Sequence, residues 1–512
     1  MRLLLLFVAS ALAVGAQPAR TVPVGDALYD AVERMQRRGL LLELHPTAQP
    51  YTEAEVAAAL DALPDSLAGV EAEWAGFLRR RLPTARPGPG EIAVRADIST
   101  TLHASTSARL DALRPLDAPR SIPLGDGALY TDADAHVAIG TDRLVAQLGV
   151  RHSLYYNDAP DGYDIVNRAM MRNEEGYFAY RSPLADVAVG RVGVQWGRAG
   201  RDALLLSNNP PPFDALHLRL GGSRVAVRGV LGQLDSALPD GTFSGTIGSR
   251  PGDRPSAEPR IDRYFAAHRF DWRPSRHVAL TVMESAVYSG ANADLSLAYL
   301  VPTHAFAFLI DNTPKNVENN GAVGAMLWAQ WRRWTLHGEV FVDDFDVVSG
   351  TEPASAALTG SLTWAGLPRA DAEIGLTAVT ARAYASPQPE GTYVFALRGL
   401  GTEFNDFVHL RARSDVYALP GLTVSPQVHA LWQGEQTPEA PYLLDNSVPA
   451  ILTGDVRRTL RLAVEGRYDR DPRWWARADL GLNLGDDAAD GFHAVVALGA
   501  RLGTAGSVRA DL

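Results

Sequence analysis

The feature that most constrains this chain is an alternation of apolar and polar side chains that recurs from residue 91 to the C-terminus. In TLRLAVEGRYDR, Leu460 and Leu462 have one parity, and Arg461 and Arg467 have the other. Because successive strand residues point to opposite faces, such a segment has one apolar and one charged face. The segments WARADLGLNL, VHLRAR and LVAQLGVRHSL repeat the pattern. Strands of a membrane barrel alternate in this way, with lipid outside and a polar lumen inside, but so do strands of a soluble sandwich.

The lengths of the links between these segments distinguish the two folds. Strands are expected to begin near residues 91, 128, 142, 176, 184, 213, 223, 261, 276, 321, 333, 356, 370, 403, 421, 455, 473 and 490. Short links such as GTD, GGS and LPG mostly alternate with long ones, as short periplasmic turns and long extracellular loops do in outer-membrane barrels. Trp272, Trp334, Tyr468 and Trp474 flank short links, where an aromatic girdle is expected. The sequence therefore predicts a mainly β fold, a transmembrane antiparallel β-barrel of about 18 strands. Whether the final SVRADL adds a further strand stays open.

The N-terminal part of the chain follows different patterns. Residues 1–16 have a basic start, an apolar run and small residues before Gln17, which is typical of a secretory signal peptide. Residues 17–90 contain three helical patterns and end in the linker PTARPGPGE, so they predict a small periplasmic helical bundle and linker. One helix begins with a capping box, in which Glu55 follows Thr52 by three residues. The barrel is expected to occupy residues 91–512, where no apolar run is long enough for a transmembrane helix.

Composition and motifs argue against several function classes. The chain contains no cysteine, so it forms no disulfides and no thiolate metal sites, which suits a Gram-negative envelope. The net charge of −11 argues against nucleic acid as a partner. No pair of histidines has H-x-x-x-H spacing, and Ser207 lacks the G-x-S-x-G context of a nucleophile. We therefore expect no catalytic residue, no metal site, no cofactor and no enzyme activity.

Polar residues on the charged faces of the predicted strands form a candidate lumen cluster. Glu339 and Asp343 share a face with His337, whereas Asp343 and Asp344 point to opposite faces and form no acid–base pair. Two interpretations remain open: the cluster binds sugar hydroxyls, or it is a charge ladder in which carboxylates pair with arginines. We favour the second. The expected members are His337, Glu339, Asp343, His409, Arg411, Arg413, Arg461, Arg467, Arg477 and Asp479.

The segment QWGRAGRDALLLSNNPPPF, residues 195–213, resembles a phosphate-binding loop only in its closely spaced glycines. No Lys-Ser/Thr pair follows Gly200, and three prolines arrive before a crossover helix is complete. The alternation of link lengths instead places the segment in a long extracellular loop, with Trp196 as an outer girdle residue. The candidate glycan-binding residues are Arg198, Arg201, Asn208, Asn209, Asn319 and Asn320.

Several stretches together resemble the capsule assembly protein Wzi family of outer-membrane proteins. VPVGDALYDAVERMQRRGLL followed by PYTEAEVAAAL is similar to the N-terminal helical region of that family. VQWGRAGRDALLLSNNPPPF is similar to its W-G-x-G…L-x-x-S-N motif, and NVENNGAVGAMLWAQ and HGEVFVDDF resemble later elements. The resemblance implies an eighteen-stranded barrel in the outer membrane of a Gram-negative bacterium, with the helical bundle at its periplasmic end. It also implies a lectin-like, non-catalytic role in assembling or retaining capsular polysaccharide at the cell surface.

The expected partners follow from this resemblance and from the charged lumen. They are capsular or exopolysaccharide and outer-membrane lipid or lipopolysaccharide, and the barrel is expected to be monomeric. Arginine-rich inner faces suit an anionic glycan, because a guanidinium pairs bidentately with a carboxylate. Two alternatives remain. One is a channel for anions or sugars, which the same charged lumen suggests. The other is a barrel enzyme, which no local motif supports.

Overall fold

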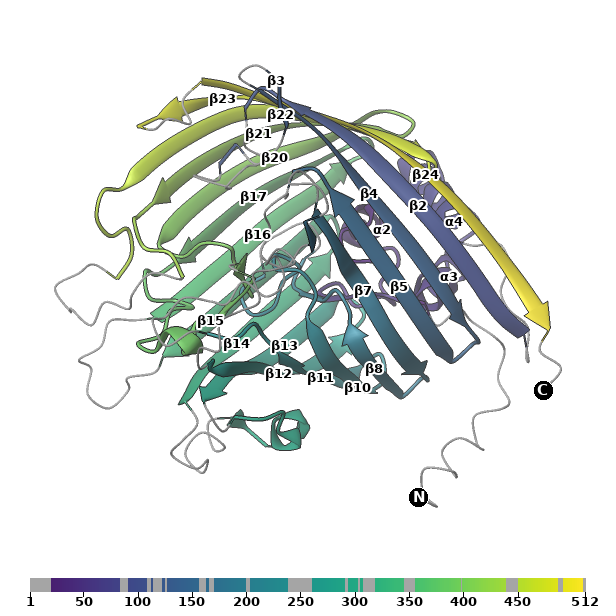
Figure 1. Cartoon of the computed structure of the whole chain (residues 1–512). Coiled ribbons are helices and arrows are strands. Elements are labelled where there is room, and N and C mark those ends of the chain that lie inside the picture. Colours follow the sequence, from purple (N-terminus) through teal and green to yellow (C-terminus); the bar gives the residue numbers. More distant parts are fainter. Residues whose placement is uncertain are drawn as a thin grey trace.

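The chain folds into a closed antiparallel β-barrel of 18 strands, with three short helices from the N-terminal part of the chain (Figure 1). The computed structural model describes residues 20–82, 91–107, 112–113, 122–124, 127–155, 163–164, 170–198, 203–237, 260–290, 293–302, 304–306, 318–344, 355–396, 398–438, 450–486 and 491–509. The expected signal peptide, residues 1–16, lies outside the described residues.

The barrel wall runs in sequence order and closes where β2 pairs with both β24 and β4. Its strands are β2 (Glu91–Ser105), β4 (Gly127–Gly140), β5 (Leu144–Ser153), β7 (Met170–Arg181), β8 (Ala185–Arg191), β10 (Asp214–Gly221), β11 (Val225–Gln233), β12 (Asp262–Ser275), β13 (Val278–Gly290), β14 (Glu318–Trp331), β15 (Trp334–Asp344), β16 (Ser355–Leu367), β17 (Ala370–Val379), β20 (Phe407–Leu419), β21 (Leu422–Gln433), β22 (Arg457–Asp471), β23 (Trp474–Gly485) and β24 (Gly491–Arg509). The short strands β3 (Ile122–Leu124) and β6 (Tyr163–Asp164) pair at its edge with β4 and β7.

The predicted fold is confirmed, and most expected strand starts agree with the observed ones to within a few residues. Residues 503–509 form the end of β24 and pair with β2, so they are no further strand. Because neighbouring strands are antiparallel, all short links lie at one end of the barrel, called here the turn end. All long links lie at the other end, called the loop end.

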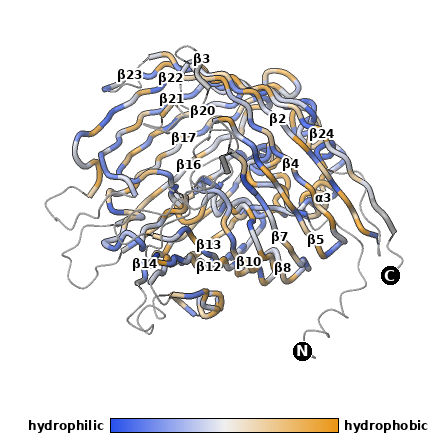
Figure 2. The backbone as a smooth tube through the Cα atoms, viewed as in Figure 1, coloured by the Kyte–Doolittle hydropathy of each residue, from blue (hydrophilic) through white to orange (hydrophobic). Residues whose placement is uncertain are grey.

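Apolar side chains point outward from the barrel and charged ones point inward, which is the reverse of a soluble β-sandwich. On β22, Leu460, Leu462 and Val464 are 40%, 45% and 44% exposed, whereas Arg461 between them is 2% exposed. Figure 2 shows the same alternation of hydrophobic and hydrophilic residues along most strands. An apolar face that is left exposed while charges are buried fits a wall surrounded by lipid.

Three helices form a small core inside the turn end of the barrel. They are α2 (Ala27–Arg37), α3 (Glu53–Asp61) and α4 (Gly69–Arg81). Their buried apolar residues pack together and against Tyr417 of β20, which points into the lumen. Arg38 donates to Leu367 O (3.0 Å) and Arg81 to Pro472 O (3.0 Å), and both acceptors lie at short turns. Among the described residues, no helix is long and apolar enough to cross a membrane.

The start of α3 follows the capping rule read from the sequence. Thr52 Oγ1 accepts a hydrogen bond from Glu55 N (3.0 Å), and Glu55 Oε2 accepts one from Thr52 N (2.7 Å). The two side chains thus satisfy backbone N–H groups that have no partner within the helix. Asp26 caps α2 in a similar way by accepting from Leu28 N (2.9 Å).

Two long links fold back into the lumen and form a second core. One is the first inner loop, residues 192–198 and 203–213, and the other is the second inner loop, residues 380–396 and 398–406. Leu204, Leu205 and Leu206 of the first loop pack with Tyr384 and Tyr393 of the second, and all five side chains are almost fully buried. Helices therefore fill the turn end of the lumen, and inner loops fill its middle.

Candidate ligand-binding site in the lumen

The helices are attached to the inner wall of the barrel largely through ion pairs. Arg37 of α2 pairs with Glu373 (3.3 Å) and Asp415 (3.4 Å), and Arg38 pairs with Asp371 (2.8 Å). Burial by itself lowers the pKa of Arg37, but Glu33, Glu373 and Asp415 outweigh burial and hold that pKa well above its usual value. Both cations therefore stay charged inside the lumen.

The first inner loop contradicts the expectation that residues 195–213 lie at the surface. Its strand β9 (Gln195–Trp196) pairs with β1 (Ala48–Gln49) of the N-terminal region, so the loop turns inward. Trp196 is 3% exposed and lies under the guanidinium of Arg269, so it is not an outer girdle residue. The sequence pattern did not reveal this, because β1 and β9 lie far apart in the chain.

Arg198 is the most deeply buried of the described candidate glycan-binding residues. It is 4% exposed, and its guanidinium contacts Glu33 of α2, Ser361 of β16 and Glu373 of β17, the last at 2.8 Å. Burial lowers the pKa of Arg198, but the two carboxylates outweigh burial and raise it above the usual value. A guanidinium held in this way is out of reach of a ligand at the cell surface.

The other candidate glycan-binding residues lie in three different places. Asn208 is exposed and Asn209 is half-buried, with Asn209 Nδ2 donating to Gly399 O (3.1 Å). Asn320 points inward and donates to Gly391 O (3.1 Å) of the second inner loop. Asn319 points outward, where its Oδ1 accepts from Tyr299 Oη (2.7 Å). Arg201 lies outside the described residues.

Three members of the candidate lumen cluster, on β15, have the predicted inward orientation. His337, Glu339 and Asp343 are all buried on the inner face. Glu339 accepts from Leu204 N (2.8 Å) and Asp343 accepts from Tyr384 N (2.7 Å). These carboxylates therefore hold the two inner loops in place.

The remaining members of the cluster include several side chains that pair with one another or with nearby carboxylates. Arg413 pairs with Asp415 (2.6 Å) and Glu465 (2.7 Å), and Arg461 pairs with Asp479 (2.7 Å). Further contacts join His409 to His429, Arg411 to Glu373, and Arg467 to Asp30 and Asp469. Arg477 is the exception, because it is exposed to the lumen. Such pairs are what a charge ladder contains, and the role of the cluster stays a prediction.

The helices, the first inner loop and the wall enclose a polar cavity of about 480 Å³, called here the lumen cavity. Asn208, Asn209 and Arg477 line it, together with Trp475. Asp132, also in its lining, lies 3.3 Å from His103 and 3.6 Å from Arg151. The volume is within the range of small-molecule sites, and the lining offers donors, acceptors and one indole ring.

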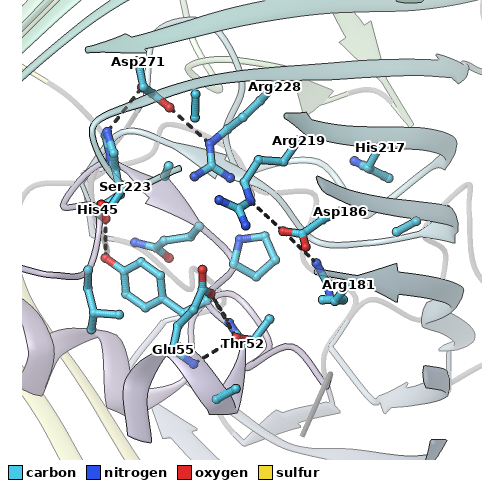
Figure 3. Close-up of a pocket in the computed structure, with 18 of the residues that line it drawn as sticks. His45, Thr52, Glu55, Arg181, Asp186, His217, Arg219, Ser223, Arg228 and Asp271 are labelled. Carbon is cyan, nitrogen blue, oxygen red and sulfur yellow. Dashed lines mark hydrogen bonds and ion pairs between the residues drawn. The ribbon is translucent and has the colours of Figure 1, made fainter. Parts of the chain in front are cut away.

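A second cavity of about 620 Å³, called here the turn-side cavity, lies between α3 and strands β7 to β12 (Figure 3). Arg219 pairs with Asp186 (2.6 Å), and Arg228 pairs with Asp271 (3.2 Å), which also lies 3.3 Å from His45 Nε2. Burial lowers the pKa of His45 well below its usual value, and the nearby arginines lower it further. Asp271 raises this pKa but does not outweigh them, so the imidazole is neutral.

Sequence analysis did not single out the turn-side cavity. Its arginines do alternate with apolar residues in HLRL and VAVRG. This alternation indicates that the arginine side chains point inward, but it does not indicate a cavity. Gln49 Oε1, His217 Nε2 and Arg273 Nε are buried in its lining without a hydrogen-bond partner among the described residues. Within the described residues, no group of three His, Cys, Asp or Glu side chains comes close enough to hold a metal ion.

The fold, the apolar outer face and the filled polar lumen together define a closed barrel of the outer-membrane type, with ligand-sized polar cavities inside. No protein-family model matches the sequence. No curated protein matches it either.

Among solved structures, the chain is similar to Wzi, an outer membrane protein involved in group 1 capsule assembly in Escherichia coli and described as a carbohydrate-binding β-barrel. That similarity has a TM-score of 0.61 at 13% identity and covers 96% of this chain and 100% of Wzi. The outer membrane protein OpdK of Pseudomonas aeruginosa is also similar, with a TM-score of 0.45 at 11% identity over 80% of this chain and 99% of OpdK. At 13% identity the likeness to Wzi concerns the fold.

Proposed function

We propose that this chain is an outer-membrane protein that binds capsular or exopolysaccharide and helps to assemble or retain it at the cell surface, without catalysing a reaction. The observation that carries the proposal is a filled lumen with polar, ligand-sized cavities, within a fold shared along nearly its whole length with a carbohydrate-binding barrel. The host is proposed to be a Gram-negative bacterium, with the turn end and the helices on the periplasmic side and a monomeric barrel in the membrane.

The lumen cavity is the proposed place of glycan contact. Asn208 and Asn209 offer amide groups to sugar hydroxyls, and Trp475 offers a ring face for stacking. Arg477 is exposed to the cavity, and its guanidinium suits a carboxylate on an anionic sugar. Arg201, on the same link as the two asparagines, remains a candidate from the sequence.

Deletion of the gene in its host tests the role in the cell. Cells that lack the protein are expected to make polysaccharide in normal amounts but to release it into the medium. Cell-bound and released polysaccharide are measured separately. A normal surface layer on the deletion strain contradicts the proposal.

Binding of purified protein to the host's own polysaccharide tests the site. The double variant Asn208→Ala, Arg477→Ala is expected to lower affinity about tenfold or more, because each lost hydrogen bond to a charged or polar ligand is worth about 1 kcal/mol or more. Arg333→Ala, an exposed arginine in a short turn, is the matched control and leaves affinity unchanged. Equal affinity of the double variant and the control contradicts the assignment of the lumen cavity.

One observation favours a second candidate, a channel for anions or sugars. The lumen cavity and the turn-side cavity are both lined by Val192, Val194, His217 and Val230, so they meet between the start of the first inner loop and strands β10 and β11. A connection at this place makes a path around the inner loops. Planar-bilayer recordings separate the two functions, since the binding protein is expected to be silent and the channel to conduct.

A further inference from the structure

The alternation of exposed and buried residues fails at one place on the outer wall. On β12, the outward residues Phe270 and Trp272 are exposed, whereas Tyr264, Ala266 and His268, which have the same parity, are buried. The neighbouring strands change in the same way: Ala286 and Tyr288 of β13 and Leu231 of β11 point outward and are almost completely buried. Something therefore covers the outer face of β11 to β13 near the loop end.

The cover is the link between β13 and β14, called here the outer flap (residues 293–302 and 304–306). Figure 1 shows it outside the wall, beneath β12. Tyr299, in its single helical turn η1 (Leu297–Leu300), stacks on Tyr288 with ring centroids 4.3 Å apart, and Tyr288 stacks on Tyr264. Tyr299 Oη also donates to Asn319 Oδ1 of β14. The flap is thus packed against the barrel rather than extended into solvent.

The flap also covers polar groups that are out of place on an outer wall. His268 Nδ1 lies 2.9 Å from Glu284 Oε1, and both side chains point outward. Phe306 N donates to Glu284 Oε2 (2.9 Å), and the Phe306 ring lies 4.5 Å from that of His268. Charged groups on a lipid-facing wall are destabilising, and more so the deeper they lie in the bilayer. A covering segment removes that destabilising effect.

The covered strip lies at the depth of the membrane. The exposed tryptophans Trp272, Trp331, Trp334 and Trp474 lie beside the short turns and are placed as an aromatic girdle at that end. A tilted transmembrane strand needs about 9–11 residues to cross the hydrocarbon core. Counted along β12 from Trp272, this span reaches the start of the strand at Asp262, so Tyr264 to His268 lie within it.

Most of the exposed side chains of the flap are large and apolar, and the exposed polar residues Asp294 and His304 lie near its two ends. Leu295, Leu297 and Val301 are 48%, 65% and 39% exposed. This surface continues the exposed apolar face of the wall, where Val282 of β13 is 61% exposed. We propose that the outer flap is a lipid-contacting segment, which lies in the half of the membrane nearest the loop end and presents Leu295, Leu297 and Val301 to acyl chains.

The chain has no cysteine, so a single introduced thiol reports its own surroundings. Leu297→Cys is labelled with a fluorophore, and the full-length protein is reconstituted in phosphatidylcholine vesicles with bromine atoms on the acyl chains, which quench fluorescence at contact distance. Val282→Cys on the outer wall is the positive control, and Asn208→Cys in the lumen is the negative control. Folding is checked by the shift in gel mobility on heating, and Leu295→Cys makes the same measurement if Leu297→Cys does not fold.

Quenching at position 297 is expected to be within about twofold of that at position 282, because both labels lie in a hydrocarbon layer about 30 Å thick. Quenching as weak as that at position 208 overturns the proposal. A disulfide-linked dimer through position 297 of the unlabelled variant, together with an unquenched label, overturns it in favour of a second copy of the chain. The measurement needs no polysaccharide, so its result is independent of the proposed glycan binding.

Discussion

At the scale of single residues, the most deeply buried arginines inside this barrel are held by several partners. Arg198 contacts Glu33, Ser361 and Glu373, and Arg461 donates to Asn483 Oδ1 (2.9 Å) as well as to Asp479. A charge taken out of water without a partner costs several kcal/mol, and these contacts offset that cost. The same requirement explains why such residues are poorly available to a ligand.

Replacing Arg198 tests this account. Arg198→Met leaves Glu33 and Glu373 without one shared cation, so the free energy of unfolding is expected to fall by about 3–5 kcal/mol. It is measured by urea unfolding in lipid vesicles, with tryptophan fluorescence as the signal. Arg333→Met, in an exposed turn, is the control and is expected to change stability by about 0.5 kcal/mol or less. An equal effect of both variants contradicts the structural role of Arg198.

Asp26 predicts a specific dependence of stability on pH. Burial raises the pKa of Asp26, but Arg81 and Arg501 outweigh burial and hold that pKa below its usual value of 3.8. A carboxylate with a lowered pKa stabilises the folded state above the unfolded pKa, and this contribution is lost as the pH falls through the folded pKa. Asp26→Asn keeps a cap for α2 but removes the charge.

The variant is therefore expected to be less stable than the original chain at pH 7, and the difference is expected to shrink as the pH falls below about 3.8. Urea unfolding over a pH series measures the difference directly. A difference that stays constant down to pH 2 contradicts the assignment to the Asp26 charge.

At the scale of elements, the alternation of apolar and polar residues along each strand determines which of its side chains face the lipid and which face the lumen. On β22, Leu462 faces outward and the buried Arg461 faces the lumen. There Arg461 pairs with Asp479 and donates a hydrogen bond to Asn483, both on β23. The outer side chains thus need an apolar surrounding, and the inner ones need polar partners. The helices follow the same logic with a longer period, because α2 buries Leu28, Val32 and Met35 along one side.

The parity of β22 predicts the effect of a charge on the outer wall. Leu462→Arg is expected to lower the free energy of unfolding in lipid vesicles by about 2–4 kcal/mol, because the guanidinium enters the hydrocarbon layer. Leu462→Ala is the control that keeps the position apolar. If the arginine variant is as stable as the alanine variant, the outer face is in contact with water and the chain does not span a membrane.

At the scale of the whole molecule, polar contacts are the main link between the barrel and the helical region, beside a small apolar cluster of Leu42 with Ala279 and Trp328. The helical core includes one buried residue from the wall, Tyr417, whereas ion pairs reach the wall from Asp26, Arg37 and Arg38. Such contacts are specific in geometry but depend on every partner being present. The helices are therefore expected to detach before the barrel itself unfolds.

The double variant Arg37→Met, Arg38→Met tests this order. It removes the pairs with Glu373, Asp415 and Asp371, so the segment of residues 20–82 is expected to become sensitive to protease while the strands stay intact. Fragment masses locate the cleavage, and circular dichroism follows the strands. Cleavage no faster than in the original chain means that ion pairs do not hold the helices.

The candidate site was predictable only in part, for a physical reason that is clearest at Glu339 and Asp343. Parity correctly placed both on the inner face of β15, because it is a local property of an extended chain. Their partners, Leu204 N and Tyr384 N, lie in loops more than 40 residues away in sequence. No local pattern specifies such a contact, so the sequence did not distinguish a sugar-binding cluster from an anchor for the loops.

The sequence by itself determined the strands, their orientation, the three helices and the Thr52–Glu55 cap. Strands show a period of two residues, helices a period of about 3.6, and the cap a spacing of three, and all of these can be recognised from residues that are close in sequence. Only the tertiary structure decided where the links go. The first inner loop turns into the lumen, where Arg198 contacts Glu33, 165 residues away, and the outer flap turns onto the outer wall, where Tyr299 contacts Tyr288 and Asn319. A link has no period of its own, so its position follows from the contacts that the finished barrel offers it.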